Sequence, residues 1–278
     1  MSKGYLSVKT YNEHDNKVEI IKMGRQIFGK LIYPCFTYKI GKILIDTGSM
    51  MAERELISYL ENDPPEFILI THGDEDHTGN LKKIQKSFDV DTYSHSGAIE
   101  YIEHPEKLKL LWYQRFVWGI PKPTTSSPIE LGKTYKFDDK KIIPISTPGH
   151  RKHHLSFYLP DLKWVFTGDI YCGRRVKTYF PYENFYEILS SIEKLKELEL
   201  SKLFCAFRGM TDSPNQKLSE KFEYMCNLKD KVINLADDGF TLKQISRKIF
   251  GRERLISLIT SGDMKHKHLI SSILLDRK

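Results

Sequence analysis

The sequence has few cysteines and no long apolar run, and both features narrow the classes of protein that it can encode. Its four cysteines stand far apart in 278 residues, without a Cys-x-x-Cys pair, which argues against a zinc knuckle or a disulfide framework. No stretch of about 18 apolar residues could span a bilayer, and the polar N-terminal segment does not resemble a secretory signal. We therefore expect a cytoplasmic protein without a membrane partner.

The sequence also lacks internal repeats, low-complexity tracts and a Gly-x-Ser-x-Gly nucleophile motif. Its net charge of +7 is spread along the chain instead of being gathered in one block, so charge alone identifies no partner. With 40% hydrophobic residues, a chain of this length can bury a sizeable core. We expect a globular protein.

The hydrophobic pattern changes along the chain. Through about residue 170, short apolar runs between turn signals predict strands, and helical patterns over 49–62, 81–88 and 185–198 accompany them. From about residue 215 the pattern becomes helical. These features predict an α/β (α+β) domain over residues 1–212, with helices able to cover both faces of a β core, and a C-terminal helical extension over 213–278 that packs on it.

A dense group of candidate metal ligands follows the apolar strand at 67–70. His72, Asp74, Asp76 and His77 fall within six positions of a segment whose glycines permit a tight turn. Imidazole nitrogen and carboxylate oxygen are ligands for zinc, iron and manganese. The spacing predicts a metal centre, and the alternative is a solvated acidic loop that contains two histidines.

Three further polar residues follow apolar strands in the same way. Asp46 begins Asp-Thr-Gly-Ser, His150 ends Thr-Pro-Gly-His, and Asp169 ends Phe-Thr-Gly-Asp. The nearby His153 and His154 are expected not to be ligands, since His154 begins the next strand. The ends of several strands thus provide one set of candidate site residues.

These motifs, in this order, resemble the metallo-β-lactamase superfamily, and in particular its glyoxalase II-like branch of hydrolases. The resemblance implies the αββα sandwich of that family. It also implies two metal sites: His72, Asp74 and His150 for one, Asp76 and His77 for the other, and Asp169 as the bridge. Asp46 would orient the loop or a ligand histidine. Its alternative role is to cap the helix that starts near Ser49.

One departure from the family pattern lies at position 74. The usual His-x-His-x-Asp-His becomes His72-x-Asp74-x-Asp76-His77, so a carboxylate replaces an imidazole. That change favours iron or manganese relative to zinc and resembles flavodiiron proteins, although the chain has no room for a flavodoxin domain. We expect one or two divalent ions, with zinc first and iron or manganese as alternatives.

The second departure is the absence of the family's last ligand histidine after the strand at 203–207, where Arg208 stands. Three explanations are open: Asp212 supplies the ligand, the second metal has only three ligands, or Arg208 replaces the metal's charge. We favour Asp212 or Arg208.

The resemblance implies that a metal-bound water attacks the substrate and that Asp76 orients this water or takes its proton. Cations after Asp169 suggest a small anionic ester, thioester or lactone as substrate, against the alternative of a solvated loop. The candidate substrate-binding residues are Arg174, Arg175, Lys177, Tyr179 and Arg208.

Other functions compete with this hypothesis. A metal-binding or regulatory protein without turnover would explain the missing histidine, and Asp74 suggests a di-iron redox protein. A nuclease is disfavoured because the chain between Asp169 and Arg208 is too short for the domain that such enzymes insert, so we do not expect nucleic acid as a partner. The oligomeric state is open, with a homodimer as one option.

Overall fold

The computed structural model describes residues 2–13, 15–253 and 255–275. The chain divides into two compact units. The first comprises Met1–Ser146, His153–Asp169 and Ser201–Asp212, and the second comprises Thr147–Lys152, Ile170–Leu200 and Ser213–Lys278. Two segments that we assigned by sequence to the first domain, 147–152 and 170–200, are thus grouped with the C-terminal helices.

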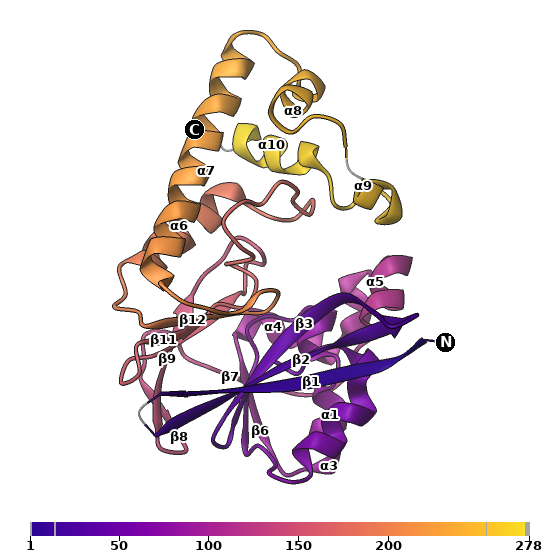
Figure 1. The fold of residues 1–278 in the computed structure, drawn as a ribbon, viewed down its shortest axis with the longest axis vertical. Helices are drawn as coiled ribbons and strands as arrows, with labels where there is room; N and C mark the ends of the chain where they lie inside the picture. Colours follow the sequence, from indigo (N-terminus) through magenta and orange to yellow (C-terminus); the bar gives the residue numbers. More distant parts are fainter. Residues whose placement is uncertain (1, 14, 254, 276–278) are drawn as a thin grey trace. The chain divides into compact units, whose positions relative to one another are not determined.

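The first unit contains a seven-stranded sheet in the order β1 to β7. Its strands are β1 (Ser2–Glu13), β2 (Asn16–Ile27), β3 (Lys30–Ile40), β4 (Ile43–Ile45), β5 (Phe67–Leu69), β6 (Asp91–Ser94) and β7 (Ser127–Pro128). Its long strands β1, β2 and β3 are labelled in Figure 1. The first four strands pair antiparallel, and β4 to β7 pair parallel. The carboxyl ends of β4 and β5 therefore meet at one edge of the sheet.

A six-stranded sheet in the order β13-β12-β11-β10-β9-β8 completes the β core of this unit. Its strands are β8 (Tyr135–Phe137), β9 (Lys140–Ser146), β10 (Leu155–Leu159), β11 (Trp164–Phe166), β12 (Lys202–Cys205) and β13 (Gly209–Thr211). Ile45 and Leu69 of the first sheet share a buried cluster with Phe157, Phe166 and Phe204 of the second. The rings of Phe166 and Phe204 stack with their centroids 4.5 Å apart. The two sheets therefore pack face to face as a sandwich.

Helices cover the other face of the seven-stranded sheet. Side chains alternate along a strand, so Leu44 points away from the cluster that its neighbours Ile43 and Ile45 enter. Leu44 packs instead with residues of α1 (Glu53–Leu60) and α3 (Leu81–Ser87). The remaining helices of this unit are η1 (Met50–Ala52), α2 (Glu75–Thr78), α4 (Ser96–Glu103), η2 (Pro105–Leu108) and α5 (Trp112–Val117).

The second unit is helical: α6 (Phe185–Lys196), α7 (Pro214–Asp237), α8 (Leu242–Phe250), α9 (Leu255–Ile259) and α10 (His266–Leu275). Asn184 caps α6 by accepting a hydrogen bond from Glu187 N at 2.9 Å, and Thr241 with Gln244 forms a capping box on α8, as their sequences predict. None of the described helices is long and apolar enough to cross a membrane. The expected mixed α/β fold with C-terminal helices is confirmed.

Candidate metal centre

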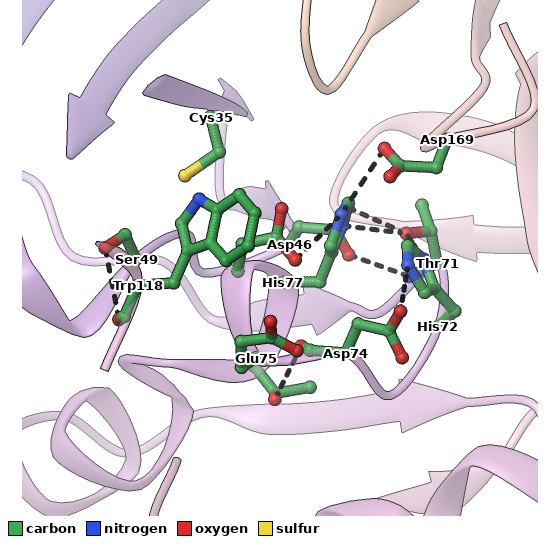
Figure 2. Close-up of polar contacts among 12 residues, drawn as sticks. Cys35, Asp46, Ser49, Thr71, His72, Asp74, Glu75, His77, Trp118 and Asp169 are labelled. Atoms are coloured by element: carbon green, nitrogen blue, oxygen red, sulfur yellow. Dashed lines mark hydrogen bonds and ion pairs between the residues drawn. The ribbon is translucent and has the colours of Figure 1, made fainter. Parts of the chain in front are cut away.

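The candidate ligands of the first unit lie where β4, β5 and β11 end. Asp46 follows β4 and adopts a left-handed backbone conformation, with φ of +59°. The parallel neighbour β5 leads through Thr71 and His72 into the short helix α2, which carries Asp76 and His77. Figure 2 shows the side chains from these loops converging with that of Asp169.

Asp46 connects the two loops through its carboxylate. Thr71 donates to it twice, from its backbone N to Oδ1 and from Oγ1 to Oδ2, both at 2.8 Å. His77 Nδ1 lies 2.7 Å from Asp46 Oδ2, which places the other ring nitrogen, Nε2, at the opposite side of the ring. These contacts are the ones that a residue orienting a ligand histidine would make. The cap of the following helix η1 comes from Ser49, whose side chain accepts from Met51 N.

His72, His77 and Asp169 each present one ligand atom within 4.8 Å of the others, and all three are buried. His77 Nε2 lies 3.5 Å from Asp169 Oδ1 and 3.8 Å from Asp76 Oδ1, while His72 Nε2 lies 3.6 Å from Asp74 Oδ2. Atoms bound to one ion at about 2.1 Å in tetrahedral geometry are roughly 3.4 Å apart. The observed spacing suits ligands that share an ion.

The polar atoms of this cluster also fit a cation. His77 Nε2 is buried and makes no hydrogen bond among the described residues, although two carboxylates face it. A buried polar atom in this state costs free energy that a bound ion would recover. The donor set of imidazoles and carboxylates matches zinc, iron or manganese.

Electrostatics point to the same conclusion. Burial raises the pKa of Asp76 to about 7, with the Asp169 and Asp74 carboxylates adding to the increase. Burial and the charges of Asp76 and Asp74 likewise raise the pKa of Glu75 to about 8. Burial works against a charged His77, but the Asp46, Asp76 and Asp169 carboxylates outweigh it and hold its pKa well above the usual value. The site concentrates negative charge that a cation would neutralise.

Glu75 is a buried carboxylate of this loop that the sequence interpretation overlooked. Its Oε1 accepts a hydrogen bond from Gln114 Nε2 of α5 at 2.8 Å. Gln114 Oε1 in turn accepts from Leu111 N at the start of that helix. The position of Glu75 between the candidate ligands Asp74 and Asp76 was a signal that the sequence contained. Its partner Gln114 lies 39 residues away and could not be predicted from the sequence.

Three histidines near the motifs bond to backbone amides. His154 Nε2 accepts from Asp169 N at 3.1 Å, and His153 Nε2 accepts from Gly73 N at 3.4 Å. His95 Nδ1 accepts from Gly97 N and caps α4. His153 and His154 thus each contact the backbone of a loop that carries candidate ligands.

His150 belongs to the second unit, where its side chain is 6% exposed. Its Nδ1 lies 2.8 Å from Glu183 Oε1, and the rings of Phe180 and Tyr182 lie beside it, with centroids 6.2 and 6.0 Å away. The sequence interpretation did not single out Glu183, because 33 residues separate it from His150.

Asp212 and Arg208, the two candidate substitutes for the last histidine, are both exposed. The Asp212 carboxylate is 75% exposed and pairs with Lys202 Nζ at 2.9 Å. The antiparallel register of β12 and β13 explains this pair, because Leu203 lies opposite Thr211 and so brings Lys202 across from Asp212. Arg208 is an exposed residue of the turn between these strands.

The candidate substrate-binding residues after Asp169 fall into two groups. Arg174, Arg175 and Lys177 are exposed, and Arg174 Nη1 lies 3.3 Å from Glu220 Oε2 of α7. Tyr179 is only 4% exposed, and its ring packs near that of Phe185, with burial raising the pKa of its hydroxyl. The cations are therefore accessible, whereas Tyr179 serves as a packing residue in this structure.

Comparison with known proteins matches residues 36–206 to the model of the metallo-beta-lactamase superfamily. The beta-lactamase-like protein 2 homolog of Caenorhabditis elegans is 25% identical over 72% of this chain and 64% of its own length. The hydroxyacylglutathione hydrolase of Brucella ovis is 33% identical over 59% of this chain and 60% of its own. The chain thus spans less than two thirds of both relatives.

The fold has solved counterparts as well. A metallo-beta-lactamase family protein from Thermus thermophilus superposes with a TM-score of 0.65 at 18% identity, over 96% of this chain and 92% of that one. At this identity the likeness concerns the fold alone.

Proposed function

The chain belongs to the metallo-beta-lactamase superfamily, and from that premise we propose that it is a metal-dependent hydrolase. The observation that carries the proposal is the buried group of His72, His77 and Asp169, in which Asp46 fixes the ring of His77. Metal sites in proteins typically contain such a group, in which the second ring nitrogen of a ligand histidine is hydrogen-bonded to a carboxylate.

We propose one or two divalent ions, zinc first and iron or manganese as alternatives, held by His72, Asp74, Asp76, His77, His150 and Asp169. Once bound, the ions would polarise a substrate oxygen and lower the pKa of a water molecule toward neutrality. Asp76 would orient that water and accept its proton, because its carboxylate lies inside the cluster, with Oδ1 3.8 Å from His77 Nε2. His154 would keep Asp169 in place through its backbone amide.

A small anionic ester, thioester or lactone is the proposed substrate. The similarity to hydroxyacylglutathione hydrolase supports a thioester, and the accessible cations Arg174, Arg175 and Lys177 support an anionic group on it. Arg208 is a further exposed cation of the chain. A carboxylate at position 74 does not alter this proposal, since it makes the first site more anionic without removing a ligand.

A metal-binding protein without turnover is the second candidate. It is favoured by one observation: Asp212, the proposed substitute for the family's last histidine, is exposed and paired with Lys202. The second ion would then have only Asp76, His77 and Asp169 of the residues assigned to it.

Elemental analysis of the purified protein, followed by turnover assays on matched anionic and neutral thioesters, tests the proposal. We expect one or two zinc, iron or manganese ions per chain and faster hydrolysis of the anionic thioester. The matched control is Arg174→Gln with Arg175→Gln, which should raise KM for the anionic substrate only. Bound metal without hydrolysis of any ester, thioester or lactone would support the second candidate, and absence of metal after reconstitution would contradict both.

A further inference from the structure

We infer that Glu183 is a positioning residue for His150 and that the C-terminal helix α10 holds Glu183 in place. The inference deepens the proposed function, because it rests on His150 as a ligand of the proposed metal site. It gives the helical extension a role that neither its sequence nor its similarity to other proteins assigns. All the residues involved belong to the second unit.

The Glu183 carboxylate is fixed at both oxygens. Oε1 lies 2.8 Å from His150 Nδ1, and Oε2 accepts a hydrogen bond from Phe180 N at 2.7 Å. The side chain is only 12% exposed, so water competes little for these bonds. A carboxylate is acceptor-only when ionised, and it therefore favours the tautomer of His150 that carries its proton on Nδ1. That tautomer leaves the lone pair on Nε2, the nitrogen that would bind the ion.

Ser272 of α10 holds the backbone around Glu183. Its Oγ donates to Glu183 O at 3.1 Å and accepts from Phe185 N at 2.8 Å. The hydroxyl of Tyr186 adds a bond to Ile273 O at 3.1 Å. One serine, 89 residues from Glu183 in sequence, thus bridges the two backbone groups on either side of Asn184.

The loop that carries His150 is fastened to the same segment. Asn184 N donates to Gly149 O at 2.8 Å, and Ser191 Oγ donates to Pro148 O at 2.7 Å. A side chain at Gly149 would collide with the backbone of Ile188, so the loop approaches α6 as closely as a glycine permits. The Arg151 guanidinium stacks over Tyr182 at 3.6 Å. The backbone of the loop and the ring of His150 are therefore held by one continuous network.

Simple packing is the competing explanation, and two features weigh against it. Burying a carboxylate costs free energy unless it is paired and hydrogen-bonded. An apolar side chain would serve a packing role without this cost. The contact is also directed at Nδ1, the ring nitrogen opposite the one that a metal would use. Packing alone would not select that atom.

The test uses the full-length protein and does not depend on turnover. Four variants are compared with the parent: Glu183→Ala, Glu183→Gln, Ser272→Ala and, as a control on the same helix, Ser271→Ala. Glu183→Gln keeps an oxygen acceptor for His150 Nδ1 but loses the charge. Circular dichroism and Tm verify that each variant folds. Ser272→Ala is a mild change, and the same measurements can be made on it if Glu183→Ala does not fold.

The first readout is the histidine ring tautomer in the metal-free protein, from long-range ¹H–¹⁵N spectra with His150 assigned through His150→Gln. We expect the Nδ1-protonated form in the parent and in Ser271→Ala, its loss in Glu183→Ala and its partial retention in Glu183→Gln. The second readout is Co²⁺ affinity and the visible spectrum of bound Co²⁺. We expect affinity to fall about 10- to 100-fold in Glu183→Ala, less in Ser272→Ala and Glu183→Gln, and not in Ser271→Ala.

An unchanged His150 tautomer in Glu183→Ala would overturn the inference, as would parent-like Co²⁺ affinity and spectrum in that variant. Failure of the proposed function gives a different result. In that case the parent hydrolyses none of the candidate substrates, yet the tautomer of His150 still depends on Glu183 and Ser272. A hydrolytic parent whose His150 is insensitive to both residues would instead leave the proposed function standing and remove the inference.

Discussion

The two units orient a histidine by the same contact but build the support differently. In the first unit Asp46 Oδ2 lies 2.7 Å from His77 Nδ1, and in the second Glu183 Oε1 lies 2.8 Å from His150 Nδ1. Asp46 stands at the end of a buried strand and also receives two hydrogen bonds from Thr71. Glu183 lies in a loop whose backbone is hydrogen-bonded to Ser272 of α10. The comparison teaches that Asp46 is held by the loop that follows the neighbouring strand β5, whereas the backbone at Glu183 is bonded to a helix 89 residues away in sequence.

The largest effect is expected from removing a ligand in the first unit. His77→Ala deletes an imidazole that faces Asp46, Asp76 and Asp169, so the metal content per chain should fall below that of the parent. Hydrolysis should drop by more than the roughly 10- to 100-fold typical of losing a support behind a ligand. Metal content and kcat/KM measured on the same preparation check this. An active, metal-loaded His77→Ala protein would contradict the proposed centre.

The next effect compares the two supports directly. Asp46→Ala leaves His77 and two donors of Thr71 without an acceptor, and we expect it to cost about 3–5 kcal/mol of unfolding free energy. Glu183→Ala, whose side chain is less deeply buried, should cost about 1–3 kcal/mol. Urea unfolding measures both, with Asp212→Ala as an exposed control that should change stability by less than about 1 kcal/mol. If Asp46→Ala and Glu183→Ala lose equal unfolding free energy, the two supports do not differ in strength as proposed.

Metal removal should make the stability of the protein depend on pH. The pKa values of Asp76 and Glu75, about 7 and about 8, lie above those of an unfolded chain, which are about 4, so their contribution is fully present below about pH 4 and is lost progressively as pH rises from there to 7 and 8. The raised pKa of His77 acts in the same direction. With a chelator present, we expect Tm to fall by several °C between pH 5.5 and pH 8.5, since about 1 kcal/mol shifts Tm by roughly 2–4 °C.

The metal-loaded protein is the control for this experiment, because a bound cation compensates the carboxylates and should flatten the profile. If Tm of the chelated protein rises over the same pH range, the pKa values of the carboxyl groups in the metal-free site are not raised as expected.

The smallest effect is expected at position 74. Asp74→His restores the imidazole of the common family pattern and should shift metal preference toward zinc, with a modest change in total metal bound. Competition between zinc and manganese, read by elemental analysis, measures the shift. Arg208→His is the companion variant, since a histidine there would restore the family's last ligand, and a rise in metal per chain would show that the second site lacks one. An unchanged metal preference in Asp74→His would mean that this carboxylate does not select the ion.

Much of the fold could be predicted from the sequence because its signals are local. Strand periodicity and turn residues placed most of the strands, and capping residues such as Asn184 and Thr241 marked helix starts that the structure contains. The motifs at Asp46, His72 and Asp169 lie at strand ends, so knowing the strands was enough to expect their convergence. The pairing of Glu75 with Gln114 and that of Glu183 with His150 were not predictable, because the partners lie far apart in sequence.

By itself, the sequence determined which residues could bind a metal. The type of a side chain decides whether it can be a ligand, and the spacing of the candidate ligands after a strand is a local property of the sequence. Only the tertiary structure decided which of them are supported and by what. It paired Asp212 with Lys202 through strand register, turned Tyr179 into the core, and joined Ser272 to Glu183 across 89 residues. Such contacts depend on how distant segments pack together, and no local pattern in the sequence encodes them.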